Sequence, residues 1–111
     1  MKKAVVYLRD IKAGILTEDD NGYLFEYDTD FLKSSNAEAI SLTLPLSDKP
    51  YRDKVLFPFF DGLIPEGWLL DIAEKNWKID TRDRMSLLLA CCKDCIGAVG
   101  VEPIKEEEYH G

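Results

Sequence analysis

The feature that most constrains the fold is the run Asp19-Asp20-Asn21-Gly22, which separates two apolar segments. Asn-Gly adopts positive φ at low cost and is typical of tight β-hairpins. Residues 12–18 (KAGILTE) precede this turn, residues 23–28 (YLFEYD) follow it, and both have strand character. Residues 3–9 (KAVVYLR) are rich in β-branched and aromatic types. The first 28 residues therefore predict an antiparallel meander of three strands.

The next segments are less regular. Residues 29–40 predict either one helical turn around Phe31-Leu32 or a plain connection. Residues 47–53 are polar and expected to be exposed. Residues 41–47 (SLTLPLS) are expected to form an edge strand or extended arm, because Pro45 cannot donate a ladder hydrogen bond. The alternation of this segment predicts that three leucines lie on one side: Leu42, Leu44 and Leu46.

Three helices are expected in the second half. The first covers residues 55–60 with Pro58 in its first turn, where a missing N–H costs nothing, and Asp61-Gly62 ends it. The second runs from Pro65 to about Trp77 and is apolar on more than one face. The third covers residues 83–92, with Asp80 as its expected cap. Its predicted buried face comprises Met85, Leu88, Leu89 and Cys92.

A last strand over residues 97–103 is expected to return to the sheet. The sequence thus predicts one α+β domain over residues 1–104, with a small antiparallel sheet and two or three helices packed on one face. Residues 105–111 are expected to be a flexible acidic tail.

Charge narrows the classes of function. The 111 residues hold 14 basic and 21 acidic side chains, a net charge of -7, without a concentrated basic face. Direct nucleic-acid binding and attachment to anionic membranes are therefore not expected. The apolar run Ala4 to Leu8 is too short for a signal peptide, and no segment is long enough to span a bilayer. These features favour a cytoplasmic protein.

Catalytic chemistry is not expected from the side chains present. His110 is the only histidine and lies one residue from the end, so a serine–histidine arrangement is improbable. Three acids lie near apolar loops without a partner that would make a catalytic pair: Asp61, Glu66 and Asp94. The three cysteines are interpreted as small apolar side chains of a buried helix end rather than zinc ligands: Cys91, Cys92 and Cys95. We therefore expect no metal, no cofactor and no enzymatic activity.

The run FPFFDGLIPEGWLL, residues 57–70, combines aromatic mass with loop formers. Its phenylalanines, at positions 57, 59 and 60, are predicted to be core residues. Trp68 follows Pro-Glu-Gly at a helix start, where it could be either a core residue or an interface anchor. Helical spacing alone does not decide between the two.

Several motifs together resemble the N-terminal domain of HipA-type kinases. They are SLTLPL at Ser41–Leu46, PFFDG at Pro58–Gly62, LIPEG at Leu63–Gly67 and DCIGAV at Asp94–Val99. The opening KAVVYLRDIKAGILTED and GYLFEYD also match, so the resemblance covers nearly the whole chain. In HipA-type proteins a serine/threonine kinase lobe follows this domain. The lobe is not among these 111 residues, so the resemblance carries over no catalytic residue.

The resemblance implies a bacterial toxin–antitoxin protein like the small HipS component of HipBST systems. Such a protein binds a separately encoded HipA-like or HipT-like kinase in trans and restrains it, and a DNA-binding HipB-like protein can join the complex. Two alternatives stay open: a subunit that completes or activates a split kinase, and a general protein-interaction domain. The expected kinase-facing residues are Asp61, Gly62, Leu63, Ile64, Pro65, Glu66, Gly67 and Trp68.

Overall fold

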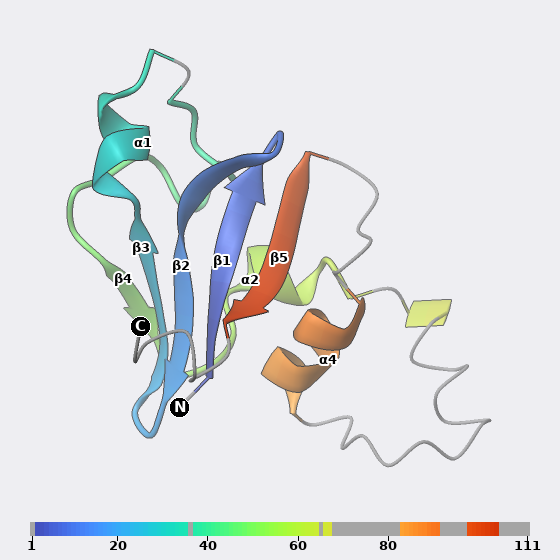
Figure 1. Ribbon diagram of the computed structural model, residues 1–111. Coiled ribbons are helices and arrows are strands. Elements are labelled where there is room, and N and C mark those ends of the chain that lie inside the picture. Colours follow the sequence, from blue (N-terminus) through green and yellow to red (C-terminus); the bar gives the residue numbers. More distant parts are fainter. Residues whose placement is uncertain (1, 36, 65, 68–82, 92–97, 105–111) are drawn as a thin grey trace.

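The structure is a computed structural model, and it describes residues 2–35, 37–64, 66–67, 83–91 and 98–104. Its frame is a five-stranded antiparallel sheet with the spatial order β4-β3-β2-β1-β5 (Figure 1). The strands are β1 Lys2–Leu8, β2 Ile11–Asp19, β3 Gly22–Tyr27, β4 Tyr51–Asp53 and β5 Val99–Ile104. The predicted meander is confirmed as β1 to β3. The predicted last strand is confirmed as β5, which pairs with β1.

Two tight turns join the strands of the meander. Between β1 and β2, Arg9 and Asp10 have φ values of 50° and 67°, as both central residues of a type I′ turn require. Between β2 and β3, the backbone N–H of Asn21 donates to a carboxylate oxygen of Asp19 at 2.8 Å. Gly22 follows with a φ of 129°. A Cβ there would lie 2.4 Å from the carbonyl oxygen of Asp53, so only glycine fits this turn.

One face of the sheet carries the core. Paired residues on neighbouring strands point to the same face, so Ala4, Leu16 and Phe25 form a row across β1, β2 and β3. All three are fully buried. Val6 of β1 and Val101 of β5 pair with each other in a second row on the same face, and both are also fully buried.

Helices cover this face and one end of the sheet. They are α1 Thr29–Lys33, α2 Pro58–Asp61 and α4 Arg84–Cys91. Figure 1 shows α1 at the end of β3, α2 behind β1 and β5, and α4 beside β5. The ring of Phe60 in α2 lies 5.6 Å from the ring of Phe25, which places α2 on the buried face. The α+β prediction is confirmed. None of the helices in the described ranges is long and apolar enough to cross a membrane.

The helix boundaries follow local chemistry. Pro58 occupies the first turn of α2 and Gly62 is its C-cap, as predicted. At the start of α4, the N–H of Ser86 donates to the carboxylate of Asp83 at 3.2 Å, so Asp83 caps this end. The predicted cap Asp80 lies outside the described residues, as do Cys92 and most of the predicted helix from Pro65. The fully buried residues of α4 are Met85, Leu87 and Leu88, of which Leu87 was not predicted.

The segment 41–53 differs from its prediction. Leu44 is 3% exposed, whereas Leu42 is 99% and Leu46 39% exposed, so the three leucines do not share one side. The chain turns at this point, because the N–H of Leu44 donates to the carbonyl of Ser41 at 3.1 Å. The strand at this sheet edge is instead β4, where Tyr51 pairs with Phe25. Arg52 and Asp53 of β4 are exposed and charged, so this strand has no hydrophobic pattern that distinguishes it from its polar neighbours.

Candidate functional site

The predicted kinase-facing segment begins at the end of α2. The N–H of Gly62 donates to the carbonyl of Pro58 at 2.9 Å and closes the helix. The N–H groups of Leu63 and Ile64 then donate to Phe60 and Asp61 at 3.0 and 3.2 Å. Three successive backbone hydrogen bonds therefore fix the conformation of residues 61–64.

The segment divides into an anchoring part and an exposed part. Ile64 is buried, and Leu63 packs against the core while remaining partly exposed. Gly62, Glu66 and Gly67 are exposed. Pro65 and Trp68 lie outside the described residues. Of the predicted contact residues, the exposed ones can meet a partner, whereas Ile64 fixes the segment to the core.

Asp61 has a partner within the chain. The guanidinium Nε of Arg84 donates to its carboxylate at 2.5 Å. Both side chains are partly exposed, at 41% for Asp61 and 31% for Arg84. The contact ties α2 to the start of α4, so it orients the candidate surface more than it offers a free acid.

The three phenylalanines that precede this segment lie in the core or pack against it. Phe57 and Phe60 are buried and Phe59 is partly buried against the core. The ring of Phe60 lies 6.3 Å from that of Phe57 and 5.2 Å from that of Phe59, both edge-on. Aromatic pairs of this geometry stabilise a core beyond their buried area. The core prediction is confirmed for these residues, and they form the base of the candidate surface.

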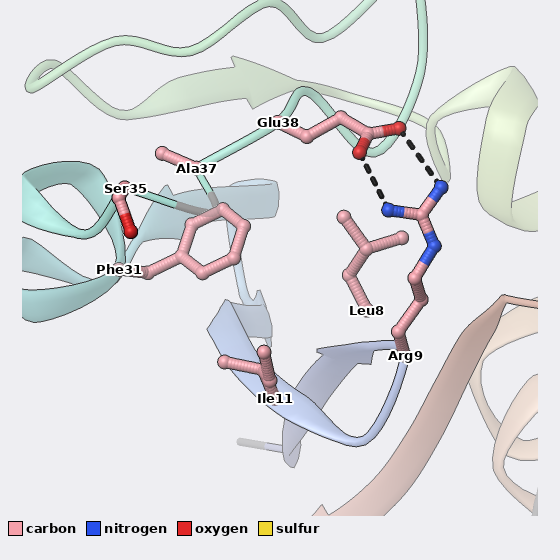
Figure 2. A pocket seen from close by; sticks show the side chains of 7 residues that line it. All are labelled: Leu8, Arg9, Ile11, Phe31, Ser35, Ala37 and Glu38. Carbon is pink, nitrogen blue, oxygen red and sulfur yellow. Dashed lines mark hydrogen bonds and ion pairs between the residues drawn. The ribbon is translucent and has the colours of Figure 1, made fainter.

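A pocket that the sequence did not predict lies at the Leu8 end of β1 (Figure 2). It encloses about 350 Å³. Its lining residues are Leu8, Arg9, Ile11, Phe31, Ser35, Ala37 and Glu38. Figure 2 shows Arg9 and Glu38 facing each other at its rim, where the guanidinium nitrogens donate to both carboxylate oxygens at 2.7 and 3.3 Å.

The chemistry of this pocket is mixed. Leu8 and Phe31 are buried, whereas Ile11 is 44% exposed, so an apolar group could rest on the lining. Arg9 and Glu38 are 63% and 51% exposed, and such surface ion pairs contribute little stability. No sequence motif marks the pocket, because it depends on a hairpin turn and a distant loop coming together.

A polar cluster closes the end of the core near α4. The ammonium group of Lys2 donates to Asp83 at 2.9 Å and to Ser86 at 2.6 Å. The hydroxyl of Tyr23 donates to Glu18 at 2.9 Å. Burial, together with this hydrogen bond, raises the pKa of Tyr23 to about 12, so the phenol stays protonated near neutral pH.

The pKa of Asp83 is shifted in the opposite direction. Burial alone would raise it, but hydrogen bonds from Lys2 and Ser86 outweigh burial and lower the pKa below its usual value. The cluster therefore attaches α4 to β1 and β2 as a set of paired charges. In the described ranges, no group of three or more His, Cys, Asp or Glu residues could hold a metal ion. The other chemical candidates, Cys92, Asp94, Cys95 and His110, lie outside those ranges.

Comparisons with known proteins agree with this fold. The family model of the HipA N-terminal domain matches residues 4–102. An uncharacterized protein of Haemophilus influenzae is 31% identical over 106 residues, which make up 96% of this chain and 96% of that protein. A solved structure, the N-terminal domain of HipA toxin, superposes with a TM-score of 0.76 at 27% identity. The match covers 96% of this chain and 95% of that chain.

The matched range contains all five strands and the three described helices, apart from the start of β1 and the end of β5. The relationship thus rests on the whole domain and not on one motif. This chain belongs to the HipA N-terminal domain family.

Proposed function

We propose that this protein binds in trans to a HipA-type serine/threonine kinase and restrains it as an antitoxin. The observation that carries the proposal is its family membership over residues 4–102, together with a structural match to the N-terminal domain of HipA toxin. In the Haemophilus influenzae relative the similarity spans 96% of that protein. A chain that carries this domain can dock on a HipA-type kinase at the place where a covalently attached N-terminal domain would sit.

The proposed contact surface is the segment 61–68. Its exposed described residues are Gly62, Glu66 and Gly67, and the buried Ile64 holds them against the core. A preorganised backbone lowers the entropy cost of binding. Trp68 follows directly in the sequence, and tryptophans are frequent binding hot spots.

The direct test is a phosphate-transfer assay with a purified HipA-type kinase that lacks its own N-terminal domain, with and without this chain. We expect the added chain to lower kinase activity and to co-elute with the kinase in gel filtration. Kinase activity that appears only in the presence of this chain would show an activating subunit instead. Absence of co-elution and of any change in activity would refute the proposal.

Trp68→Ala tests the surface itself. The variant should weaken kinase binding by about 2 kcal/mol or more while circular dichroism shows an unchanged fold. An unfolded variant would identify Trp68 as a core residue. A folded variant that binds like the wild type would remove Trp68 from the proposed surface.

A further inference from the structure

The turn formed by residues 41–44 presents a leucine to solvent. Leu42 at its tip is 99% exposed, the most exposed of the large apolar side chains in the described parts of the chain. Single exposed leucines are common and need no special explanation. Three features of this turn, its fixed conformation, its attachment to the core and its lack of charge, distinguish Leu42 from an ordinary exposed leucine.

The turn is closed by three short contacts. The N–H of Leu44 donates to the carbonyl of Ser41 at 3.1 Å, and the N–H of Thr43 donates to the Ser41 hydroxyl at 3.2 Å. The hydroxyls of Ser41 and Thr43 lie 3.0 Å apart. Side-chain hydrogen bonds of this type fix a local backbone conformation. The tip is therefore held in one geometry although its own side chain contacts almost nothing.

The base of the turn is attached to the core. Leu44 is buried, and its carbonyl accepts a hydrogen bond from the buried hydroxyl of Tyr27. The same hydroxyl accepts from the N–H of Ile40 at 3.1 Å. On the other side, the hydroxyl of Tyr51 donates to the carbonyl of Pro45 at 2.7 Å. Two strands, β3 and β4, thus hold the turn from both ends.

The turn is also free of charge in a highly charged chain. Residues 39–47 contain no acidic or basic side chain, whereas 32% of the chain is charged. Charged residues flank this stretch at Glu38 and Asp48. The cores of protein interfaces are depleted of charge and surrounded by a polar rim. The pattern therefore matches a small protein contact and does not suit an anionic lipid or nucleic acid.

We infer that Leu42 enters an apolar pocket on the HipA-type kinase, as a second contact in addition to residues 61–68. This inference rests on the proposed function. A single turn buries far less than the roughly 1,600 Å² of a standard stable interface, so it cannot hold a homodimer by itself. As an added contact in a larger complex, a rigidly presented leucine contributes its burial without a large ordering cost.

The test measures the affinity of the purified kinase, without its own N-terminal domain, for the wild type and for Leu42→Asp by calorimetry. We expect Leu42→Asp to weaken binding about tenfold or more, which is the loss of one buried leucine. Val55→Asp is the matched control, because Val55 is 63% exposed and lies outside the turn. It should change affinity less than about twofold. Thermal unfolding of both variants should match the wild type closely, since both side chains are mostly exposed.

The outcomes separate the two proposals. Equal binding by wild type and Leu42→Asp would overturn the role of Leu42 and leave the proposed function in place. No binding by the wild type would overturn both. Sedimentation that shows a wild-type dimer, lost in Leu42→Asp while kinase affinity is unchanged, would assign the turn to a second copy of this chain and contradict the inference.

Discussion

At the scale of single residues, Tyr27 has the most demanding position. Its ring packs between Phe25 and Phe31, with centroid distances of 4.9 and 6.2 Å, and its hydroxyl is buried between Leu44 and Ile40. Burial raises the pKa of this phenol, so it remains a neutral donor. One hydroxyl therefore links a β-strand to the backbone that presents Leu42.

We expect Tyr27→Phe to lower the free energy of unfolding by about 1–3 kcal/mol. The substitution keeps the ring but leaves the buried carbonyl of Leu44 and the N–H of Ile40 without this partner, and unsatisfied buried groups cost about that much. Urea denaturation measures the change.

Tyr51→Phe is the matched control for Tyr27→Phe. Its hydroxyl also bonds a carbonyl of this segment, that of Pro45, but at an exposed site. Water can replace that contact, so the loss should stay below about 1 kcal/mol. Equal losses in both variants would contradict the importance of burial.

Residue-level inference succeeded where composition alone decides burial and failed where a turn reverses the chain. The density of aromatic residues at Phe57 to Phe60 predicted a core, and the structure agrees. The alternation of Leu42, Leu44 and Leu46 predicted a shared side, which is wrong because the tight turn at Ser41 breaks the period of two. Backbone and hydroxyl contacts within Ser41–Leu44 close that turn, and hydrogen bonds from Tyr27 and Tyr51 anchor it.

At the scale of elements, Gly14 controls how β2 lies beside β3. A Cβ at this position would lie 2.2 Å from the carbonyl oxygen of Glu26, which is backbone and cannot move aside cheaply. Gly14→Ala should therefore force the two strands apart and lower the free energy of unfolding by about 1–3 kcal/mol. Chemical denaturation measures the loss.

Gly100→Ala serves as the control for Gly14→Ala. Gly100 also lies in a strand, but a Cβ there would meet no atom within 4 Å. The substitution should be neutral or slightly stabilising, because alanine restricts the unfolded chain more than glycine does. A large loss at Gly100 would mean that both effects arise from the backbone conformation and not from crowding.

The attachment of α4 should depend on pH through Asp83. The pKa of Asp83 is lowered in the folded state, so its ion pair with Lys2 stabilises the protein above pH 3.8 and is lost as pH falls below that value. Both side chains are partly exposed, which limits the contribution to about 1 kcal/mol or less. Asp83→Asn should therefore be less stable than the wild type at pH 7, and the gap should narrow as pH falls from 3.8 toward about 3.

Urea unfolding at both pH values measures this gap, and Asp48→Asn on an exposed loop should show none. A gap for Asp83→Asn that persists at low pH would mean that the carboxylate acts by shape and not by charge. The prediction also separates the roles of Asp83, since its hydrogen bond to the N–H of Ser86 can be kept in part by asparagine.

The positions of helices and strands could be predicted where residues with special backbone chemistry, such as glycine and proline, mark their ends. The Asn21-Gly22 turn and the end of α2 at Gly62 lie where backbone chemistry predicted them, whereas α2 begins at Pro58 and not at residue 55 as predicted. The strand β4 was missed because two of its three residues are exposed and charged, so its pairing with β3 leaves no hydrophobic pattern. The pocket beside Arg9 was missed for a similar reason, since its walls are distant in sequence.

At the scale of the whole molecule, the order of the sheet was partly within reach of sequence reasoning. Short turns made β1, β2 and β3 neighbours, and the family resemblance implied one domain across nearly the whole chain. The sequence did not determine which edge receives β5, because that choice depends on α4 packing beside it. The match to a solved HipA toxin domain confirms the resemblance, while the partner and its inhibition remain the subject of the proposed experiments.

The net charge of -7 leads to a prediction about the rate of complex formation. A kinase cleft that binds nucleotide phosphates is positively charged, so an acidic partner should be steered toward it. The association rate should fall about tenfold between roughly 0.05 and 0.5 M salt, while the dissociation rate changes little. Stopped-flow mixing at several salt concentrations measures both rates.

Leu42→Ala tests the apolar contribution separately, because it removes apolar contact without changing the charge of the chain. It should raise the dissociation rate about tenfold and leave the association rate and its salt dependence unchanged. An association rate independent of salt would show that the acidic surface does not guide the encounter. A salt-dependent dissociation rate would instead indicate that charged side chains, such as that of Glu66, remain in contact with the kinase in the bound complex.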